Sequence, residues 1–377
     1  MGSDGRAPTR VLMVTDSLLK YTAALARGLA DAGAEVKLLG RDHGLEFGGD
    51  EAEMYEYVAE TLGGRAEHLV LPGRVREPRH WRRTMALHRR LRNFDADVVH
   101  YQETVVNDPR LLVAAPPARG RTVVTVHDPV SRLEHGEPGW QRATKSRLLK
   151  RASLVFVHAE ALRGQVVEEW GIQAPIVVIP HGIATPRVRP LPATPTLLAF
   201  GRIQPYKGLD VLFDAMPTIW ADVPETLLRV VGQGRLAEHP VLSDPRVEVN
   251  NEYLPESAVP ELFGDATAVV LPYREASQSG VGSLAKEYGR AIVASDVGGL
   301  AELVGDAGRV VPPSSAPALS GALLELLRDP ELAAELGRRA AASVEGTAGW
   351  VDVGRQTLEA YRSYLEPSRI SARRPAS

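Results

Sequence analysis

The chain has 377 residues, of which 44% are hydrophobic and 24% charged, and its formal net charge is -3. This length suffices for two or three domains, and the composition is that of a globular protein rather than a disordered, fibrous or general nucleic-acid-binding one. The sequence contains no cysteine. That excludes disulfide frameworks, thiolate metal sites and cysteine nucleophiles, and it favours a reducing compartment.

The ends of the sequence predict neither a secretory signal nor a membrane anchor. The first residues, MGSDGRAPTR, run directly into an apolar segment without the three parts of a signal peptide. Nowhere does the sequence reach the roughly 18 consecutive apolar residues of a spanning helix. We therefore expect a cytoplasmic protein whose membrane contacts are at most peripheral. Residues 367–377, rich in Pro, Ser and Arg, are predicted to form a disordered tail.

The first half alternates short apolar runs with longer helical patterns. A strand at 10–15 and a helix at 19–33 are followed by predicted strands at 35–40, 97–102, 122–128, 154–159 and 176–182. These runs are apolar throughout instead of alternating. That pattern is typical of a parallel sheet covered by helices on both faces.

A second series of strands begins at residue 196 and continues at 227–232, 247–250, 268–273, 291–296 and 309–313. Between the two series, 184–195 contains four prolines, which predicts a stiff linker. We therefore predict an α/β protein of two Rossmann-like, doubly wound domains, 1–184 and 185–345, that face a central cleft. Ligands should bind at the carboxyl ends of the strands.

Two turns of the second domain have the composition of phosphate sites. In GRIQPYKG, Gly201 lets the backbone turn, and Arg202 and Lys207 stand near the start of a helix. Helix-terminal amides and two cations suit a diphosphate, although a solvated turn with incidental basic residues is the alternative.

The other turn follows the strand at 268–273. Its small or polar residues stand where the next helix begins, so their amides can point at an anion; they are Gln278, Ser279, Gly280 and Val281. Ser279 is alternatively only the N-cap of this helix.

Four segments jointly resemble a known family: GRIQPYKG, VIPHG at 178–182, QSGV with the following EYGRAIVASDVGGLAELV, and WVDVGRQTLEAYRSYL at 350–365. They are similar to the retaining nucleotide-sugar glycosyltransferases of the GT-B fold, the family 4 group. The likeness is strongest from 176 to 311. It implies that a helix within 346–366 crosses back to the first domain.

The resemblance also implies an activity. The enzyme would be a hexosyl-type transferase of class EC 2.4 that moves a sugar from a UDP-, GDP- or similar donor to an unknown acceptor hydroxyl, with retention and without metal or cofactor. Arg202 and Lys207 would hold the diphosphate, helped by Gly201 and the helix start at 279–281. His127 would face the transferred sugar, and Glu275 would accept a hydrogen bond from another sugar hydroxyl. A strand-end histidine bonded to backbone is the alternative for His127.

The sequence departs from the family pattern in both domains. Leu284 occupies the position of the second of two glutamates that the family usually carries, and Glu275 is offset by one from the first. Glu287 shares a helical face with Leu284, so it is a candidate for the donor ribose; the alternative is a solvated glutamate.

In the first domain, a glycine pair that often follows the first strand is replaced by a loop of bulkier residues. We interpret four of them as acceptor-side candidates, with a capped helix start as the alternative; they are Asp16, Ser17, Lys20 and Tyr21.

Three other segments have less specific patterns. Asp95-Ala96-Asp97 is spelled like a metal motif but precedes a strand, so we predict no metal there. Gly232-Gln233-Gly234 reads as a tight turn beside the nucleotide cleft rather than a dinucleotide fingerprint. Residues 74–92 carry eight arginines and one glutamate, which indicates either a helix lying on an anionic membrane or a solvated outer helix.

Two alternatives to the transferase remain. A sugar-nucleotide epimerase of the same architecture would act without an acceptor. A non-catalytic nucleotide-sugar-binding partner subunit is suggested by Leu284 and by the altered first loop.

Overall fold

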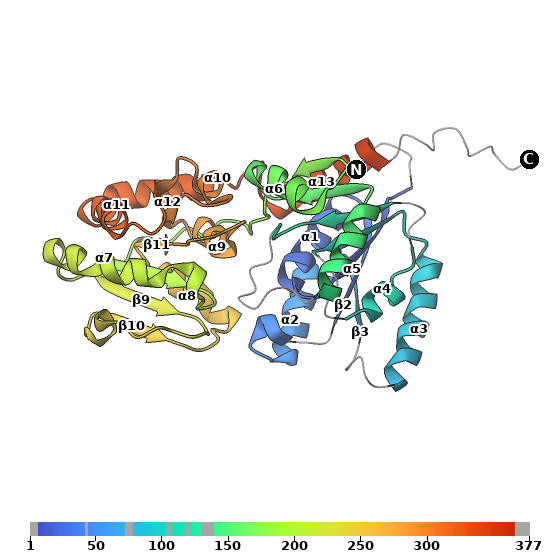
Figure 1. Cartoon of the computed structure of the whole chain (residues 1–377), viewed down its shortest axis with the longest axis horizontal. Helices are drawn as coiled ribbons and strands as arrows, with labels where there is room; N and C mark the ends of the chain where they lie inside the picture. The colour runs from blue at the N-terminus through green and yellow to red at the C-terminus, as the bar shows by residue number, and fades with distance from the viewer. Residues whose placement is uncertain are drawn as a thin grey trace, which may run out of the picture. The chain divides into compact units, whose positions relative to one another are not determined.

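The computed structural model describes residues 7–41, 44–71, 78–103, 108–117, 121–129 and 139–365. The chain forms two compact units (Figure 1). Unit 1 runs to Gly182 and takes up the chain again at Trp350, whereas unit 2 is the continuous segment Ile183–Gly349. The tail predicted at 367–377 lies outside the described residues.

Unit 1 is built on a parallel sheet of seven strands in the order β3-β2-β1-β4-β5-β6-β7. Its strands are β1 (Arg10–Thr15), β2 (Glu35–Arg41), β3 (Glu67–Leu71), β4 (Val98–Gln102), β5 (Thr122–Thr125), β6 (Leu154–Val157) and β7 (Ile176–Val178). Chain order reverses between β1 and β4, and open α/β sheets bind ligands beside such a switch point.

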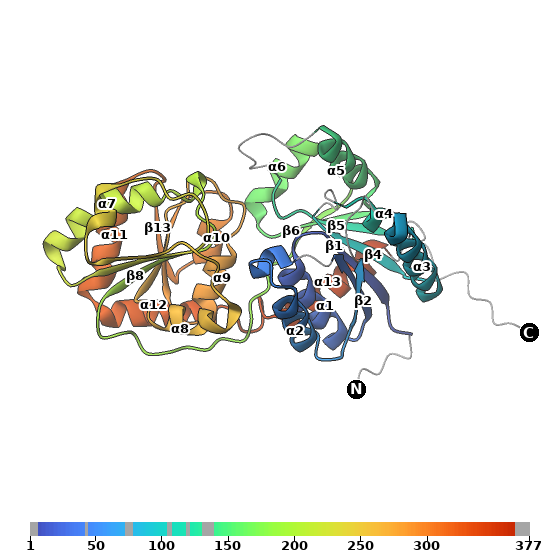
Figure 2. The same cartoon turned by 90° about the horizontal axis from the view of Figure 1, so that it is seen from below.

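Helices cover both faces of this sheet. They are α1 (Leu19–Asp31), α2 (Glu51–Leu62), α3 (Pro78–Phe94), α4 (Arg110–Ala114), α5 (Gly139–Arg151), α6 (Glu160–Trp170) and α13 (Trp350–Leu365). Figure 2 shows α4, α5 and α6 on one side of the sheet and α1, α2 and α13 on the other. On the first side, Leu111, Leu149 and Leu162 share a core with the strand residues Leu12 and Val124.

Helix α13 packs directly on α1 through two glycines. A Cβ atom added at Gly28 would lie 2.1 Å from the carbonyl oxygen of Trp350, and one added at Gly354 would lie 2.2 Å from the carbonyl carbon of Gly28. The two backbones therefore touch, and α13 completes unit 1 although almost half the chain separates it from the other helices of that unit.

Unit 2 has a parallel sheet of six strands in the order β10-β9-β8-β11-β12-β13. Its elements are β8 (Thr196–Phe200), α7 (Leu209–Asp222), β9 (Leu227–Val231), β10 (Val247–Asn250), α8 (Val259–Gly264), β11 (Ala268–Leu271), α9 (Gly280–Glu287), β12 (Ala291–Ser295), α10 (Leu300–Val304), β13 (Gly308–Val311), α11 (Ala316–Arg328) and α12 (Pro330–Ala342). Separate hydrophobic clusters fill its two faces. Two doubly wound, Rossmann-like units confirm the predicted fold class.

The proline-rich segment 184–195 is fastened to unit 2. Arg290, which is fully buried, donates from its guanidinium to the carbonyl oxygens of Arg189 at 2.8 Å and Pro190 at 3.2 Å. The backbone N–H of Arg187 donates to the carbonyl of Glu287 at 2.6 Å. Most of the predicted linker is therefore held as part of this unit.

Candidate functional site

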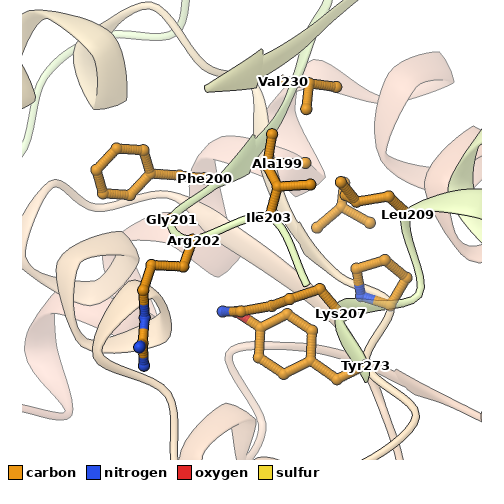
Figure 3. A pocket seen from close by; sticks show the side chains of 11 residues that line it. Ala199, Phe200, Gly201, Arg202, Ile203, Lys207, Leu209, Val230 and Tyr273 are labelled. Carbon is orange, nitrogen blue, oxygen red and sulfur yellow. The ribbon is translucent and has the colours of Figure 1, made fainter. Parts of the chain in front are cut away.

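In unit 2, the turn between β8 and α7 depends on glycine. Gly201 has a φ of +99° and Gly208 a φ of +63°, and a Cβ at Gly208 would lie 2.0 Å from the carbonyl oxygen of Pro272. Only glycine readily takes such a backbone this close to another segment. Gly208 therefore allows the turn to lie against the loop after β11. The resulting pocket is lined by the 199–203 turn, Lys207 and Tyr273 (Figure 3).

Lys207 links the two predicted phosphate turns. Its Nζ donates a hydrogen bond to the hydroxyl of Tyr273 at 2.5 Å and lies 4.1 Å from the centre of that ring. The Tyr273 hydroxyl is 3.3 Å from Oγ of Ser279, and this Oγ accepts from the backbone N–H of Gly282, also at 3.3 Å. A lysine ammonium is thus held beside the N-terminus of α9, where an anion is favoured.

The neighbouring donor-side candidates gather at the same place. A Cβ added at Gly201 would lie 3.3 Å from Val281 and 3.8 Å from Lys207 Nζ, so these three residues are neighbours. Arg202 is exposed, and the Lys207 ammonium points toward its side chain (Figure 3). Ser279 is the N-cap of α9, as the capping interpretation predicted.

The loop between β11 and α9 carries the remaining candidates. Glu275 and Gly280 are exposed and Gln278 is half-buried. The preceding Arg274 is tied to α7 by an ion pair with Asp210 at 2.5 Å, and this hydrogen-bonded guanidinium lowers the pKa of Asp210. The pair holds the loop that presents Glu275.

Glu287 lies at the other end of α9. Seven residues of helix place it about 10 Å along the axis from Gly280, away from Lys207 and toward the linker. It is 8% exposed, and burial raises its pKa although Arg187 Nε lies 3.8 Å from its carboxylate. The interpretation of Glu287 as an ordinary solvated helix residue is therefore wrong.

The Gly232-Gln233-Gly234 segment forms a close-packed turn. Ile203 N–H donates to the carbonyl of Gln233 at 2.9 Å, and Cβ atoms at Gly232 and Gly234 would lie 2.2 and 2.1 Å from the carbonyl oxygens of Gly201 and Ile203. Its glycines allow the Lys207 turn to sit against the end of β9, which confirms the prediction of a tight turn.

Unit 1 carries a different site at its strand ends. The strands predicted to reach residues 128, 159 and 182 end at Thr125, Val157 and Val178, and the loops that follow them hold His127, His158 and His181. Because the carboxyl ends of parallel strands share one edge, the three rings meet: the His127 and His158 centroids are 4.6 Å apart, and those of His158 and His181 are 5.3 Å apart.

Tyr21 packs at the centre of this histidine cluster. Its ring centre lies 4.7 Å from His127, 5.3 Å from His158 and 5.0 Å from His181, and 5.2 Å from Trp350 of α13. The side chain is 8% exposed. The acceptor-side candidate is thus placed as a packing residue against His127.

The other candidates of the first loop have separate environments. Asp16 is buried and its carboxylate lies 3.1 Å from Nε of Arg41. Ser17 is exposed, and Lys20 Nζ lies 4.4 Å over the ring of Phe47. Helix α1 is capped from a distance, because the backbone N–H groups of Leu19 and Lys20 donate to the Glu46 carboxylate at 2.7 and 3.2 Å.

A buried ion pair holds the loop that carries His127. Glu103, directly after β4, accepts from the backbone N–H of His127 at 2.6 Å and from Lys145 Nζ at 2.5 Å. Lys145 is 4% exposed and also donates to the carbonyl of Asp128 at 3.0 Å. The ring nitrogens of His127 face Gln102 at 3.1 Å and His158 at 3.2 Å, so the interpretation of a ring bonded only to backbone is wrong.

The histidine cluster is neutral at physiological pH. Burial lowers the pKa of His158 to about 3 and that of His181 to about 4. Burial, reinforced by His158 and His181, holds the pKa of His127 well below its usual value. The rings therefore offer hydrogen-bonding groups rather than positive charge.

Several residues of these sites were not predicted from the sequence. Tyr273, His158 and His181 stand in the last residues of the strands predicted at 268–273, 154–159 and 176–182, a position that could have marked them. Glu103 directly follows the strand predicted at 97–102 and has the same signal. Lys145 has none, because its partnership with Glu103 joins segments that lie 42 positions apart.

Asp95 and Asp97 serve the fold. The Asp97 carboxylate accepts from the backbone N–H of Arg10 at 2.9 Å, and that of Asp95 from the Arg10 guanidinium at 3.1 Å.

Among the residues that the structure describes, no three His, Asp or Glu side chains are grouped so as to hold a metal ion. In the described parts of the chain, no helix has both the length and the apolar character needed to cross a membrane.

Comparison with known proteins decides the family. Residues 20–187 match the model described as Glycosyltransferase Family 4, and residues 194–329 match the model Glycosyl transferases group 1. The chain belongs to glycosyltransferase family 4. The family 4 resemblance expected from the sequence is thus confirmed.

Individual relatives have low sequence identity to this chain but align with it over long segments. Phosphatidyl-myo-inositol mannosyltransferase of Mycolicibacterium smegmatis is 26% identical, covering 93% of this chain and 91% of its own length. A GDP-mannose-dependent phosphatidylinositol monomannoside mannosyltransferase of the same organism is 28% identical over 54% of this chain and 62% of its own. Among solved structures, Anabaena HepE with UDP and glucose superimposes with a TM-score of 0.67 at 19% identity, covering 94% of this chain and all of that one (100%).

Proposed function

We propose that this family 4 protein is a retaining, hexosyl-type glycosyltransferase that moves a sugar from a nucleoside-diphosphate donor to an acceptor hydroxyl. One observation carries the proposal: Lys207 is held by Tyr273 beside the N-terminus of α9, with Arg202 next to it. Two cations and helix-terminal amides at one strand edge form a site for a diphosphate.

The chemistry follows from the charge of the leaving group. Cleavage of the bond between the anomeric carbon and the phosphate oxygen leaves negative charge on the diphosphate and positive charge on the sugar. Lys207, Arg202 and the first amides of α9 stabilise the departing diphosphate, and one preorganised donor of this kind is worth about 3 to 4 kcal/mol of barrier. In this scheme the acceptor hydroxyl attacks from the leaving-group side and passes its proton toward the diphosphate, without a metal or cofactor.

The other site residues take roles around this centre. His127 faces the transferred sugar, and Glu275 accepts from another of its hydroxyls. The buried carboxylate of Glu287 suits the donor ribose, whose two hydroxyls can donate to it. On the acceptor side, Ser17 and Lys20 are the candidates that the packing of unit 1 leaves at its surface.

A panel of nucleotide sugars tests the donor site. We expect GDP-mannose or UDP-glucose to raise the melting temperature, because a ligand at 100 times its dissociation constant adds about 2.7 kcal/mol. Arg202→Ala and Lys207→Ala should remove the shift. Arg338→Ala, which removes an exposed arginine of α12, is the matched control. Binding with no turnover against any acceptor would favour the partner-subunit alternative, and isomerised donor without acceptor would favour the epimerase.

We also propose that α3 makes peripheral contact with anionic membranes. Trp81 and Met85, one turn apart, are 38% and 43% exposed, and Arg82 and Arg89 are exposed beside them. Such a face combines apolar insertion with attraction to anionic lipid. Of the arginine-rich segment 74–92, residues 74–77 lie outside the described residues.

Vesicle sedimentation tests this contact. Wild-type protein should sediment with vesicles containing phosphatidylglycerol, and less so at high salt, whereas Trp81→Ala with Met85→Ala should stay in solution. Tyr55→Ala, on the exposed surface of α2 at 44% exposure, is the control. Equal sedimentation with neutral phosphatidylcholine vesicles would contradict an electrostatic contact.

A further inference from the structure

A continuous chain of polar side chains crosses unit 1 from α13 to the loop after β7. Its successive contacts are Tyr361 Oη to His100 Nδ1 at 2.6 Å, His100 Nε2 to the Gln102 amide at 3.2 Å, that amide to His127 Nε2 at 3.1 Å, His127 Nδ1 to His158 Nε2 at 3.2 Å, and His158 Nδ1 to the carbonyl oxygen of Ile179 at 2.9 Å. Only His127 has a role in the proposed reaction.

The carbonyl end of the chain fixes the protons of two rings. A carbonyl oxygen only accepts, so Nδ1 of His158 carries its hydrogen. His158 is 5% exposed and packed among other imidazoles, so the ring is neutral. Its Nε2 therefore carries no hydrogen, that is, it is bare. A bare nitrogen also only accepts. The facing Nδ1 of His127 must therefore carry the hydrogen, which leaves Nε2 of His127 bare.

The remaining members then follow in turn. A bare Nε2 on His127 requires the NH2 group of Gln102 to face it, so the amide is turned end for end from the placement in which its oxygen faces His127 and its nitrogen faces His100. The hydrogen-bond network decides this orientation for any glutamine amide. The amide oxygen then faces His100 Nε2, which donates to it and toward the Thr125 hydroxyl at 2.7 Å. Nδ1 of His100 is left to accept from the hydroxyl of Tyr361.

Every hydrogen bond of this chain thus points the same way, from Tyr361 to Ile179. Tyr361, His100 and Gln102 are 2%, 0% and 1% exposed, so water does not compete for the bonds along this part. Hydrogen bonds aligned in series polarise one another. Reversing one ring would place two acceptors or two donors face to face, so the burial and the alignment together make the order of protons cooperative.

We propose that this one-way chain holds His127 as its Nδ1–H tautomer, and that His158 and His100 are positioning residues for it. This inference rests on the proposed function, in which His127 faces the sugar, and it specifies which hydrogen bond His127 can make with that sugar. The single lone pair of this Nε2 accepts from the NH2 group of Gln102, so a sugar hydroxyl, which can donate, binds there by taking the place of that NH2 group, whereas a phosphate or carbonyl oxygen cannot. The hydrogen bond at one ring nitrogen sets the chemistry of the other.

Nuclear magnetic resonance tests the tautomer without any substrate. In a two-bond 15N–1H correlation spectrum of protein labelled at histidine, bare and protonated ring nitrogens resonate far apart. His127, assigned by His127→Gln, should show Nδ1 protonated and Nε2 bare. His239, whose Nε2 faces Asp214 at 3.1 Å in unit 2, should show the opposite pattern and serves as the internal reference. Protonation of His127 at Nε2 would overturn the proposal.

Variants at His158 test the positioning role. His158→Phe removes the acceptor, so His127 should turn to the Nε2–H tautomer. The kcat should fall by about 10- to 100-fold, the loss typical for the outer hydrogen-bond partner of a metal-ligating histidine, with little change in donor KM. His158→Gln keeps an acceptor oxygen and should restore most of the rate. Unchanged tautomer and kcat in His158→Phe would overturn the proposal.

A variant that removes a single hydroxyl is less able to disturb folding than one that replaces a whole ring. Tyr361→Phe removes the first donor of the chain, and His127 should keep its tautomer while kcat falls by a smaller factor. If His127 shows the Nδ1–H form but no donor is turned over, the proposed function fails and the hydrogen-bond chain stands. If turnover is present with the other tautomer, the reverse holds.

Discussion

The strand ends of the two units show how one topology can carry two different sets of side chains. In unit 2, the edge carries Lys207, Arg202 and the N-terminus of α9, whose first turn has no acidic residue. In unit 1, the corresponding edge carries neutral imidazoles and tyrosine, and the N-terminus of α1 is already occupied by the Glu46 carboxylate. Side chains in the loops, rather than the fold, thus decide the charge at each strand edge.

Under the proposed function, the cations of unit 2 suit the diphosphate of the donor, and the neutral imidazoles of unit 1 suit a group that carries hydroxyls. A diphosphate near α1 would compete with Glu46 for the same amides. A sugar hydroxyl near His127 meets an uncharged acceptor.

Removing the Lys207 charge has the largest expected effect. Lys207→Met keeps most of the side-chain volume but loses the cation that faces the leaving group, so kcat should fall by about 10²- to 10³-fold. Steady-state kinetics with the preferred donor measure this. Lys150→Met, the same substitution at an exposed site of unit 1, should leave the rate unchanged, and an equal loss in both variants would contradict the assignment.

Acid should weaken unit 1 before unit 2. The pKa of His158 is lowered to about 3 and that of His181 to about 4 in the folded protein, so between these values and about 6.5 the unfolded chain binds more protons. Stability therefore falls as pH decreases through this window, by about 2 kcal/mol at pH 5 for each such histidine.

Urea unfolding followed separately for each unit measures this pH dependence, with signals from histidine side chains of unit 1 and from Trp220 of unit 2. The unit 1 transition should move to lower urea between pH 7.5 and 5. A unit 1 transition that is independent of pH would show that its histidines bind protons in the folded protein as readily as in the unfolded chain.

Tyr273→Phe should have an intermediate effect. It keeps the ring beside Lys207 but removes the hydroxyl that accepts from the ammonium, and a hydrogen bond to a charged group contributes about 1.5 to 3 kcal/mol. We expect kcat/KM to fall by about tenfold or somewhat more. Tyr206→Phe is the control, because the Tyr206 ring lies farther from Nζ, at 5.7 Å. Equal effects of the two substitutions would indicate that only ring contacts matter.

Loss of one N-cap should have the smallest effect. Ser279→Ala and Ser315→Ala remove the caps of α9 and α11, each at a cost of about 1 kcal/mol in stability. The melting temperatures should fall alike, but only Ser279→Ala should also weaken nucleotide binding, measured by calorimetry. Unchanged nucleotide affinity in Ser279→Ala would remove the N-terminus of α9 from the site.

The sequence was sufficient for features that depend on local pattern. Continuous apolar runs predicted two parallel sheets, and GRIQPYKG placed two cations at a helix start because glycine, cations and helix lie within eight residues. Strand ends were predicted too late at 128, 159 and 182, since apolar residues continue into loops. Glu46, Lys145 and Tyr361 could not be found in advance, because tertiary packing brings them to partners that lie 26 to 261 positions away.

Helix α13 has a consequence for the order in which the protein matures on the ribosome. Unit 2 is one uninterrupted segment, so it can fold as soon as it emerges, in keeping with the tendency of domains to fold as units during synthesis. Unit 1 has to wait, with the surface of α1 around Gly28 uncovered, until α13 is translated. Because Tyr361 supplies the first proton donor of the His127 chain, a nascent polypeptide acquires this order of hydrogen bonds only after α13 has emerged.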